Sequence, residues 1–149
     1  MAEFTELDLQ RIEIAKKLFA AWSSGNADAP ADFMAPDATL WDSIGGQKDG
    51  WANIREYFAH GLQRYPDLVL EPTGEYWARP DGIALQWVMS ATVMDDSKGA
   101  EHKGKKWIVE GLSFLQFDGL TVVLEADYHE GTSRDKSLHE GGLHAPIRR

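Results

Sequence analysis

The segment 50–70 reads GWANIREYFAHGLQRYPDLVL, and the spacing of its hydrophobic residues changes at Pro66. From Trp51 onward, hydrophobic residues recur every three or four positions, which predicts a helix over residues 50–64 with Asp49 as its N-cap. Pro66 ends that helix because proline lacks a backbone N–H. After Pro66 the hydrophobic residues follow a period of two, which predicts a strand over residues 68–78. The chain therefore changes from mainly helical to extended structure near its middle.

The helices are expected before this point and most strands after it. Thr5 and Asp8 have the spacing of a capping box, which predicts a helix over residues 7–24. A short second helix is expected before Pro36, over residues 29–34. The other periodic segments predict strands over residues 38–43, 83–94, 106–117 and 120–129. Three N-terminal helices against a curved, mixed, mostly antiparallel sheet form an α+β fold.

Length and composition exclude several classes of protein. The chain has 149 residues, no cysteine and a formal charge of −9 at pH 7. The length fits one domain, residues 1–149, with a core over 7–130 and a loosely held tail over 131–149. The negative charge argues against binding to nucleic acid or to an anionic membrane. The sequence has no basic and apolar leader and no apolar stretch of about 18 residues, so we expect a cytoplasmic protein.

The predicted strand 107–117 is apolar on both of its faces. Ile108 and Leu112 alternate along it with Trp107 and Val109. Such a strand is typically covered on both sides. Helices can cover one side, and a second copy of the chain is the simplest cover for the other. We therefore expect a homodimer, or another homo-oligomer, that forms through the sheet face.

Four short motifs follow one another along the chain: FMAPDATLWD at 33–42, GWANI at 50–54, FDG at 117–119 and EADYH at 125–129. In this order and spacing the chain resembles the nuclear transport factor 2-like superfamily, and within it the SnoaL-like and ketosteroid-isomerase-like enzymes. The resemblance implies a sheet that wraps the helices into a cone with an internal apolar pocket. It does not choose a reaction, because this fold hosts isomerases, dehydratases, cyclases, epoxide hydrolases and non-enzymes.

Asp42 is the first candidate catalytic residue. The resemblance to ketosteroid isomerases implies that an acid at this position is the general base. Trp41 and Trp51 are near it in sequence, and loss of water around the carboxylate would raise its pKa toward a useful range. The alternative is a structural aspartate that caps the turn over residues 43–46.

Glu110 is the second candidate because it interrupts the apolar strand 107–117. Buried carboxylates are rare unless they are paired or protonated. The resemblance places Glu110 near the protonated acid of the oxyanion hole of ketosteroid isomerases, where it would donate a hydrogen bond to a substrate oxygen. The alternative is a buried salt bridge, which could cross a subunit interface.

Asp127 and His129 are the remaining catalytic candidates. The resemblance implies a catalytic acid or base at Asp127, as in SnoaL-like cyclases and limonene-type epoxide hydrolases. Strict alternation puts Glu125, Asp127 and His129 on one side of the strand. That polar stripe could line a cavity, with His129 and Asp127 as an acid–base pair. Alternatively it is the solvent face of an edge strand.

Aromatic side chains are the candidate walls of the pocket, with a plain hydrophobic core as the alternative. The substrate-binding candidates are Phe19, Trp22, Trp41, Tyr57, Phe58, Trp87, Trp107 and Phe114. Ketosteroid isomerases carry a catalytic tyrosine in the first helix, where this chain has Leu18 and Phe19. That difference argues against the isomerisation of 3-oxosteroids.

No motif for a cofactor or metal is found in the sequence. It lacks a glycine-rich phosphate-binding loop, a nucleophile elbow and a dinucleotide fingerprint, and its histidines lack zinc-ligand spacing. We therefore hypothesise a cofactor-independent enzyme that moves protons on a small, bulky, apolar substrate, aromatic or polycyclic, as a lyase or isomerase does. The alternatives are a non-catalytic ligand-binding or interaction domain of the same fold, and a SnoaL-type cyclase or epoxide hydrolase.

Overall fold

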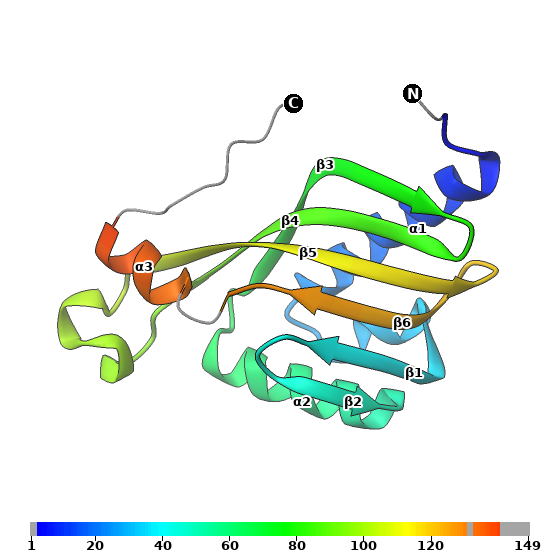
Figure 1. Ribbon diagram of the computed structural model, residues 1–149. Coiled ribbons are helices and arrows are strands. Elements are labelled where there is room, and N and C mark those ends of the chain that lie inside the picture. The colour runs from blue at the N-terminus through cyan, green and yellow to red at the C-terminus, as the bar shows by residue number, and fades with distance from the viewer. Residues whose placement is uncertain (1–2, 131–132, 141–149) are drawn as a thin grey trace.

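The computed structural model describes residues 3–130 and 133–140. It is an α+β structure in which helices and 3-10 turns lie against one six-stranded sheet (Figure 1). The helices are α1 (Glu6–Trp22), α2 (Trp51–Arg64) and α3 (Ser133–Glu140). The strands are β1 (Met34–Asp42), β2 (Gly46–Asp49), β3 (Val69–Arg79), β4 (Gly82–Thr92), β5 (Lys106–Asp118) and β6 (Thr121–Tyr128).

Helix α1 begins at the predicted capping box. The backbone N–H of Thr5 donates to Asp8 over 2.8 Å, and the N–H of Asp8 donates to the Thr5 hydroxyl over 3.1 Å. Arg11 is buried on the same helix and donates to the carbonyls of Pro80 and Gly119, each over 3.0 Å. These bonds join α1 to the β3–β4 turn and the β5–β6 turn. They fix the helix against the end of the sheet where these two turns lie.

Two local predictions were wrong. The second helix, expected over 29–34, is a 3-10 helix at Ala29–Asp32 with Pro30 at its start, so two of the three expected N-terminal helices form. Asp49, expected to cap the next helix, is the last residue of β2, a strand missed because it is short and polar. Gly50 takes the cap position with φ of 81°, a left-handed conformation that favours glycine.

The strand order β2-β1-β6-β5-β4-β3 confirms the mixed sheet. Strands β1 and β6 pair in parallel, and the other neighbours pair antiparallel. Strand β6 therefore lies inside the sheet. The alternative that Asp127 sits on an edge strand is wrong, because β1, from a distant part of the sequence, covers that edge.

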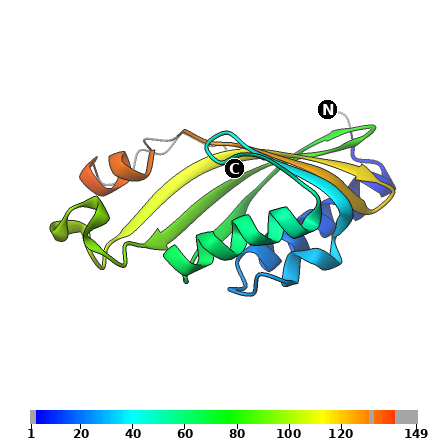
Figure 2. The ribbon, with the colours of Figure 1, turned by 90° about the horizontal axis from the view of Figure 1, so that it is seen from below.

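Helices α1 and α2 cover the same face of the sheet, which is the inner face (Figure 2). On β5, Trp107 and Val109 point to this face and are buried, whereas Leu112 points to the opposite, outer face and is 40% exposed. The hydrophobic core lies between the helices and the inner face. Within the described residues, no helix is long and apolar enough to cross a membrane.

The strand register brings three polar residues together in a row across the inner face. Asp42 on β1 pairs with Asp127 on β6, and Asp127 pairs with Ser113 on β5. A bulge precedes this row: Val122 and Leu124 pair with consecutive residues of β5, so Val123 is an extra residue. The bulge reverses the alternation of β6, so Val122 and Asp127 both face inward.

Helix α3 lies in the part of the chain that was expected to be a loosely held tail. It packs beside the start of β5 (Figure 1). The N–H of Ile108 donates to the Ser137 hydroxyl over 2.9 Å. The guanidinium carbon of Arg134 lies 4.4 Å from the centre of the Trp107 ring. These contacts place α3 at one end of the sheet.

Candidate functional site

A cavity of about 450 Å³ lies against the inner face of the sheet. Its acidic and polar lining comes from Asp42, Tyr57, His60, Glu125, Asp127 and His129. Its apolar lining comes from Trp22, Leu40, Phe58, Gly61, Tyr65, Leu68, Leu70 and Met89. Its basic lining comes from Arg64 and Arg134. The cavity thus combines broad apolar walls with several groups that can exchange protons or bind charge.

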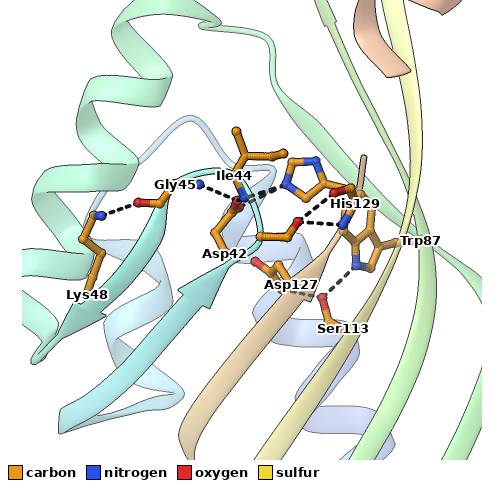
Figure 3. A network of polar contacts seen from close by, with 9 residues as sticks. Asp42, Ile44, Gly45, Lys48, Trp87, Ser113, Asp127 and His129 are labelled. Atoms are coloured by element: carbon orange, nitrogen blue, oxygen red, sulfur yellow. Dashed lines mark hydrogen bonds and ion pairs between the residues drawn. The ribbon is translucent and has the colours of Figure 1, made fainter. Parts of the chain in front are cut away.

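Asp42 ends β1 and caps the turn that follows. Its Oδ1 accepts hydrogen bonds from the N–H groups of Ile44 and Gly45, over 2.7 and 2.9 Å (Figure 3). Burial raises the pKa of Asp42, but hydrogen bonds from His129 and from these two N–H groups outweigh it, so its pKa is lowered. The structural alternative is therefore observed, and the same carboxylate also contacts His129.

His129 follows β6 and points toward Asp42 (Figure 3). Its Nε2 lies 3.2 Å from both carboxylate oxygens of Asp42. The side chain is 5% exposed, and its ring lies edge-to-face with Trp87 at a centroid distance of 5.9 Å. Asp42 therefore holds the imidazole in one orientation through Nε2.

Asp127 is buried beside Asp42 and has a different set of partners. The Ser113 hydroxyl donates to its Oδ1, and Trp87 Nε1 donates to that hydroxyl over 2.7 Å (Figure 3). Burial raises the pKa of Asp127, the Ser113 hydrogen bond lowers it, and the charge of Asp42 raises it again. The result is a pKa of about 6. Asp127 is therefore a carboxyl group that changes its charge near neutral pH.

Glu125 belongs to the polar stripe that was expected to line a cavity, but sequence reasoning did not assign it a catalytic role. It is 1% exposed, and Trp22 Nε1 donates to its Oε2 over 3.1 Å. Burial, and next the charge of Asp127, raise its pKa well above the usual value. The only signal for it in the sequence was its position two residues before Asp127. Glu125 and Asp127 form a buried pair of acids that share the cavity wall.

Tyr57 on α2 adds a hydroxyl to the same site. Burial, and next the charges of Asp42 and Asp127, raise its pKa to about 12, and it hydrogen-bonds with Asp42. Its hydroxyl lies against Gly45, where a Cβ atom would stand 2.2 Å from the tyrosine oxygen. Glycine at this position therefore lets the tyrosine approach the turn. The cavity thus receives from α2 a hydroxyl that the first helix lacks at Leu18 and Phe19.

The structure does not bring every predicted site residue to the cavity. Glu110 shares the outer face with Leu112, so its predicted pocket role is wrong. Trp41 and Phe114 also lie on that outer face. Three other rings pack in the hydrophobic core and do not line the cavity: Phe19, Trp87 and Trp107. Of the predicted rings, those that line the cavity are Trp22, Tyr57 and Phe58.

Glycine at position 111 explains how Trp87 reaches its place in the core. A Cβ atom there would stand 2.2 Å from the Trp87 ring. The indole therefore lies over Gly111, from where its N–H donates to Ser113.

Within the part of the chain that the structure describes, no group of three or more histidine, cysteine or acidic side chains is arranged to hold a metal ion.

Comparison with known proteins places this chain in a family. The model of the SnoaL-like domain matches residues 15–125. IdmH of Streptomyces antibioticus, a proposed polyketide cyclase, is 16% identical over 87% of this chain and 99% of its own, with a TM-score of 0.76. TerC, crystallised with polyporic acid, is 15% identical over 87% of this chain and 98% of its own, with a TM-score of 0.70.

A third structure is a protein of Catenulispora acidiphila with a ketosteroid isomerase-like fold, in complex with trimethylamine. It is 20% identical over 82% of this chain and 88% of its own, with a TM-score of 0.72. At these identities the three structures show a common fold, as the resemblance from the sequence implied. The family match covers more than half of the residues, and the chain belongs to the SnoaL-like domain family.

Proposed function

We propose that this protein is an enzyme that transfers protons on a bulky, apolar, aromatic or polycyclic substrate. The observation that carries the proposal is Asp127, a carboxyl group with a pKa of about 6 on the wall of a cavity. A general base works best when its pKa lies near the working pH, because it is then ionised and still basic. Asp127 meets that condition, and Asp42, whose pKa is lowered, does not.

In the proposed step, the Asp127 carboxylate takes a proton from a carbon next to a substrate carbonyl. The C–H electron pair moves to the carbonyl oxygen and forms an enolate. His129, oriented by Asp42 and in its imidazolium form, then donates its Nδ1 proton to the enolate oxygen. The raised pKa of Glu125 favours its neutral form beside Asp127. An isomerase would return the proton to another carbon, and a lyase would expel a leaving group.

The walls of the cavity support an apolar substrate. Phe58 packs edge-to-face on Trp22 at a centroid distance of 4.7 Å, and both rings line the cavity. A volume of about 450 Å³ lies within the ~300–1,000 Å³ typical of small-molecule sites. Two neighbours of the same fold were crystallised with small molecules, polyporic acid and trimethylamine. The proposed partner is therefore a small organic molecule.

A second candidate is cyclisation, favoured by the likeness to IdmH, a proposed polyketide cyclase. The same enolate would then attack a second carbonyl of the substrate and form a carbon–carbon bond. His129 would protonate the resulting alkoxide. This route uses the same base, so it changes the fate of the enolate and not the first step.

The test is hydrogen–deuterium exchange at the activated CH₂ of 2-tetralone, a bicyclic ketone, followed by proton NMR in D₂O. We expect the protein to accelerate exchange, with a rate that rises with pH about a midpoint near 6. Asp127→Asn should lower the rate by ~10²–10⁴. The control is Asp118→Asn, an exposed aspartate at the end of β5. Binding of 2-tetralone without exchange would favour a non-catalytic binding domain.

We also propose that a second copy of the chain covers the outer face of the sheet. A row of alternating large and small residues crosses this face in register: Trp41, Ala126, Phe114, Ala84 and Trp77. Ridges and hollows of this kind can fit a second copy related by a two-fold axis. Leu112 and Trp77 are 40% and 51% exposed there. Light scattering on the wild type and on Leu112→Glu tests the dimer, which the charge should dissociate.

A further inference from the structure

Two arginines line the same cavity and have no part in the proposed proton transfer. Arg64 is the last residue of α2, and Arg134 comes from α3. Their guanidinium carbons lie 5.4 and 5.5 Å from the centre of the same ring, that of Tyr65. Two cations from distant parts of the sequence thus converge on one ring of the cavity wall.

Neither guanidinium is neutralised by an ion pair in the part of the chain that the structure describes. The ion pairs formed there by arginine join Arg55 to Asp28 and Arg79 to Asp81, both away from the cavity. The pKa of Asp95 is lowered mainly by hydrogen bonds from Ser97 and only secondarily by the charge of Arg64. The arginines at the cavity therefore keep hydrogen-bonding capacity for another anion.

Stacking holds Arg134 in a conformation suited to binding. Its guanidinium carbon is 4.4 Å from the Trp107 ring centre as well as 5.5 Å from that of Tyr65. A guanidinium held over aromatic rings loses little further freedom when it binds, and its N–H groups at the edge remain available. That edge matches the two oxygens of a carboxylate.

Apart from the two arginines and the histidines, the charged groups that line the cavity are acids. Asp42 is ionised at neutral pH and Asp127 changes charge near pH 6, so a second anion is disfavoured beside them. The arginines offer the opposite charge. A ligand with an apolar body and one acidic group would therefore bind in one orientation, with that group away from Asp127.

We propose that the substrate carries a carboxylate and that Arg64 and Arg134 bind it. The inference rests on the proposed function in one respect, because it assigns this group to the substrate of the same cavity. The arginine pair selects acidic aromatic or polycyclic molecules over their neutral analogues. It also turns the uncharged, reactive part of the molecule toward Asp127 and His129.

The test compares the binding of 2-naphthoate and 2-naphthamide, which have the same ring and nearly the same shape but differ in charge. Affinities are measured by calorimetry at pH 7.5 on the full chain. The wild type should bind naphthoate ~10–100-fold more tightly, the range expected for hydrogen bonds to a charged group. Arg134→Gln and Arg64→Gln should each reduce that ratio, and the double variant should bring it close to one.

Arg79→Gln is the matched control. Arg79 also stacks on an aromatic ring, with its guanidinium carbon 5.7 Å from the centre of Phe114, but it lies on the outer face. This variant should keep the preference for naphthoate. Circular dichroism of each variant shows whether it has folded.

Three results would overturn the proposal: equal affinities in the wild type, an unchanged ratio in the double variant, or no binding of naphthoate at millimolar concentration. These results concern charge selection only. A failure of the proposed function shows separately, as a rate of 2-tetralone exchange that Asp127→Asn leaves unchanged. The two ideas can therefore fail independently.

Discussion

Asp42 and Asp127 are the same residue type, face each other on neighbouring strands and line one cavity, yet their pKa values shift in opposite directions. The β1–β2 turn around Asp42 supplies two backbone N–H groups, and His129 supplies a third contact. The β5–β6 pair around Asp127 supplies two side-chain donors, the Ser113 hydroxyl and the Glu125 carboxyl. Burial and the charge of Asp42 outweigh these donors at Asp127, whereas the donors outweigh burial at Asp42.

The difference also assigns a different task to each region. Asp42 holds the turn and orients His129, so it is a positioning residue in the proposed mechanism. Asp127 lies beside a second buried acid, Glu125, whose pKa is raised well above its usual value. These surroundings leave the charge of Asp127 free to change.

Asp42→Ala should have the largest effect on stability. It removes the carboxylate that accepts hydrogen bonds from the N–H groups of Ile44 and Gly45, and a hydrogen bond to a charged group contributes about 1.5–3 kcal/mol. The free energy of unfolding in urea at pH 7 should therefore fall by about 2–5 kcal/mol. Asp42→Asn keeps an acceptor oxygen and should lose less. Equal losses in the two variants would show that the hydrogen bonds of the turn are not the cause.

Asp127→Asn should raise stability at pH 7. The pKa of Asp127 is about 6 in the folded protein, against 3.8 for an ordinary aspartate. The stabilisation that the bound proton gives to the folded state is therefore complete below pH 3.8 and is lost as the pH rises through 6. Asparagine remains neutral throughout. The gain over wild type should grow between pH 4 and pH 7 to at most about 3 kcal/mol. A gain that does not depend on pH would contradict the raised pKa.

Glu125→Gln should have the smallest effect, because the raised pKa of Glu125 favours its neutral form and glutamine has nearly the same shape. Its amide oxygen can still accept the Trp22 N–H bond. We expect a change in unfolding free energy of less than about 1 kcal/mol and a change in exchange rate of less than about threefold. The contrast is Glu125→Ala, which leaves the indole N–H unpaired. A large loss in Glu125→Gln would mean that Glu125 acts as an anion.

Much of this arrangement follows from local sequence patterns. The capping box predicts the start of α1, the helical spacing before Pro66 predicts α2, and period-two alternation predicts most strands. The family resemblance singled out Asp127, and alternation placed His129 in the same polar stripe, and the structure brings both to one cavity with Asp42.

What the sequence could not predict depends on contacts between distant segments. Strand β5 is apolar on both faces, so alternation alone could not say that Glu110 faces outward. The parallel pairing of β1 with β6 sets Asp42 opposite Asp127, and no local pattern encodes such a pairing. Arg134 could not be assigned because α3 forms in a polar segment that has no hydrophobic period.

The central claim is that two neighbouring aspartates titrate in opposite directions from their usual pKa. Carbon-13 NMR of the aspartate carboxyl carbons measures this directly, with the signals assigned through Asp42→Asn and Asp127→Asn. We predict that the Asp127 carbon titrates with a midpoint near 6 and that the Asp42 carbon titrates below 3.8. A midpoint below about 4 for Asp127, or a higher midpoint for Asp42 than for Asp127, would contradict the account.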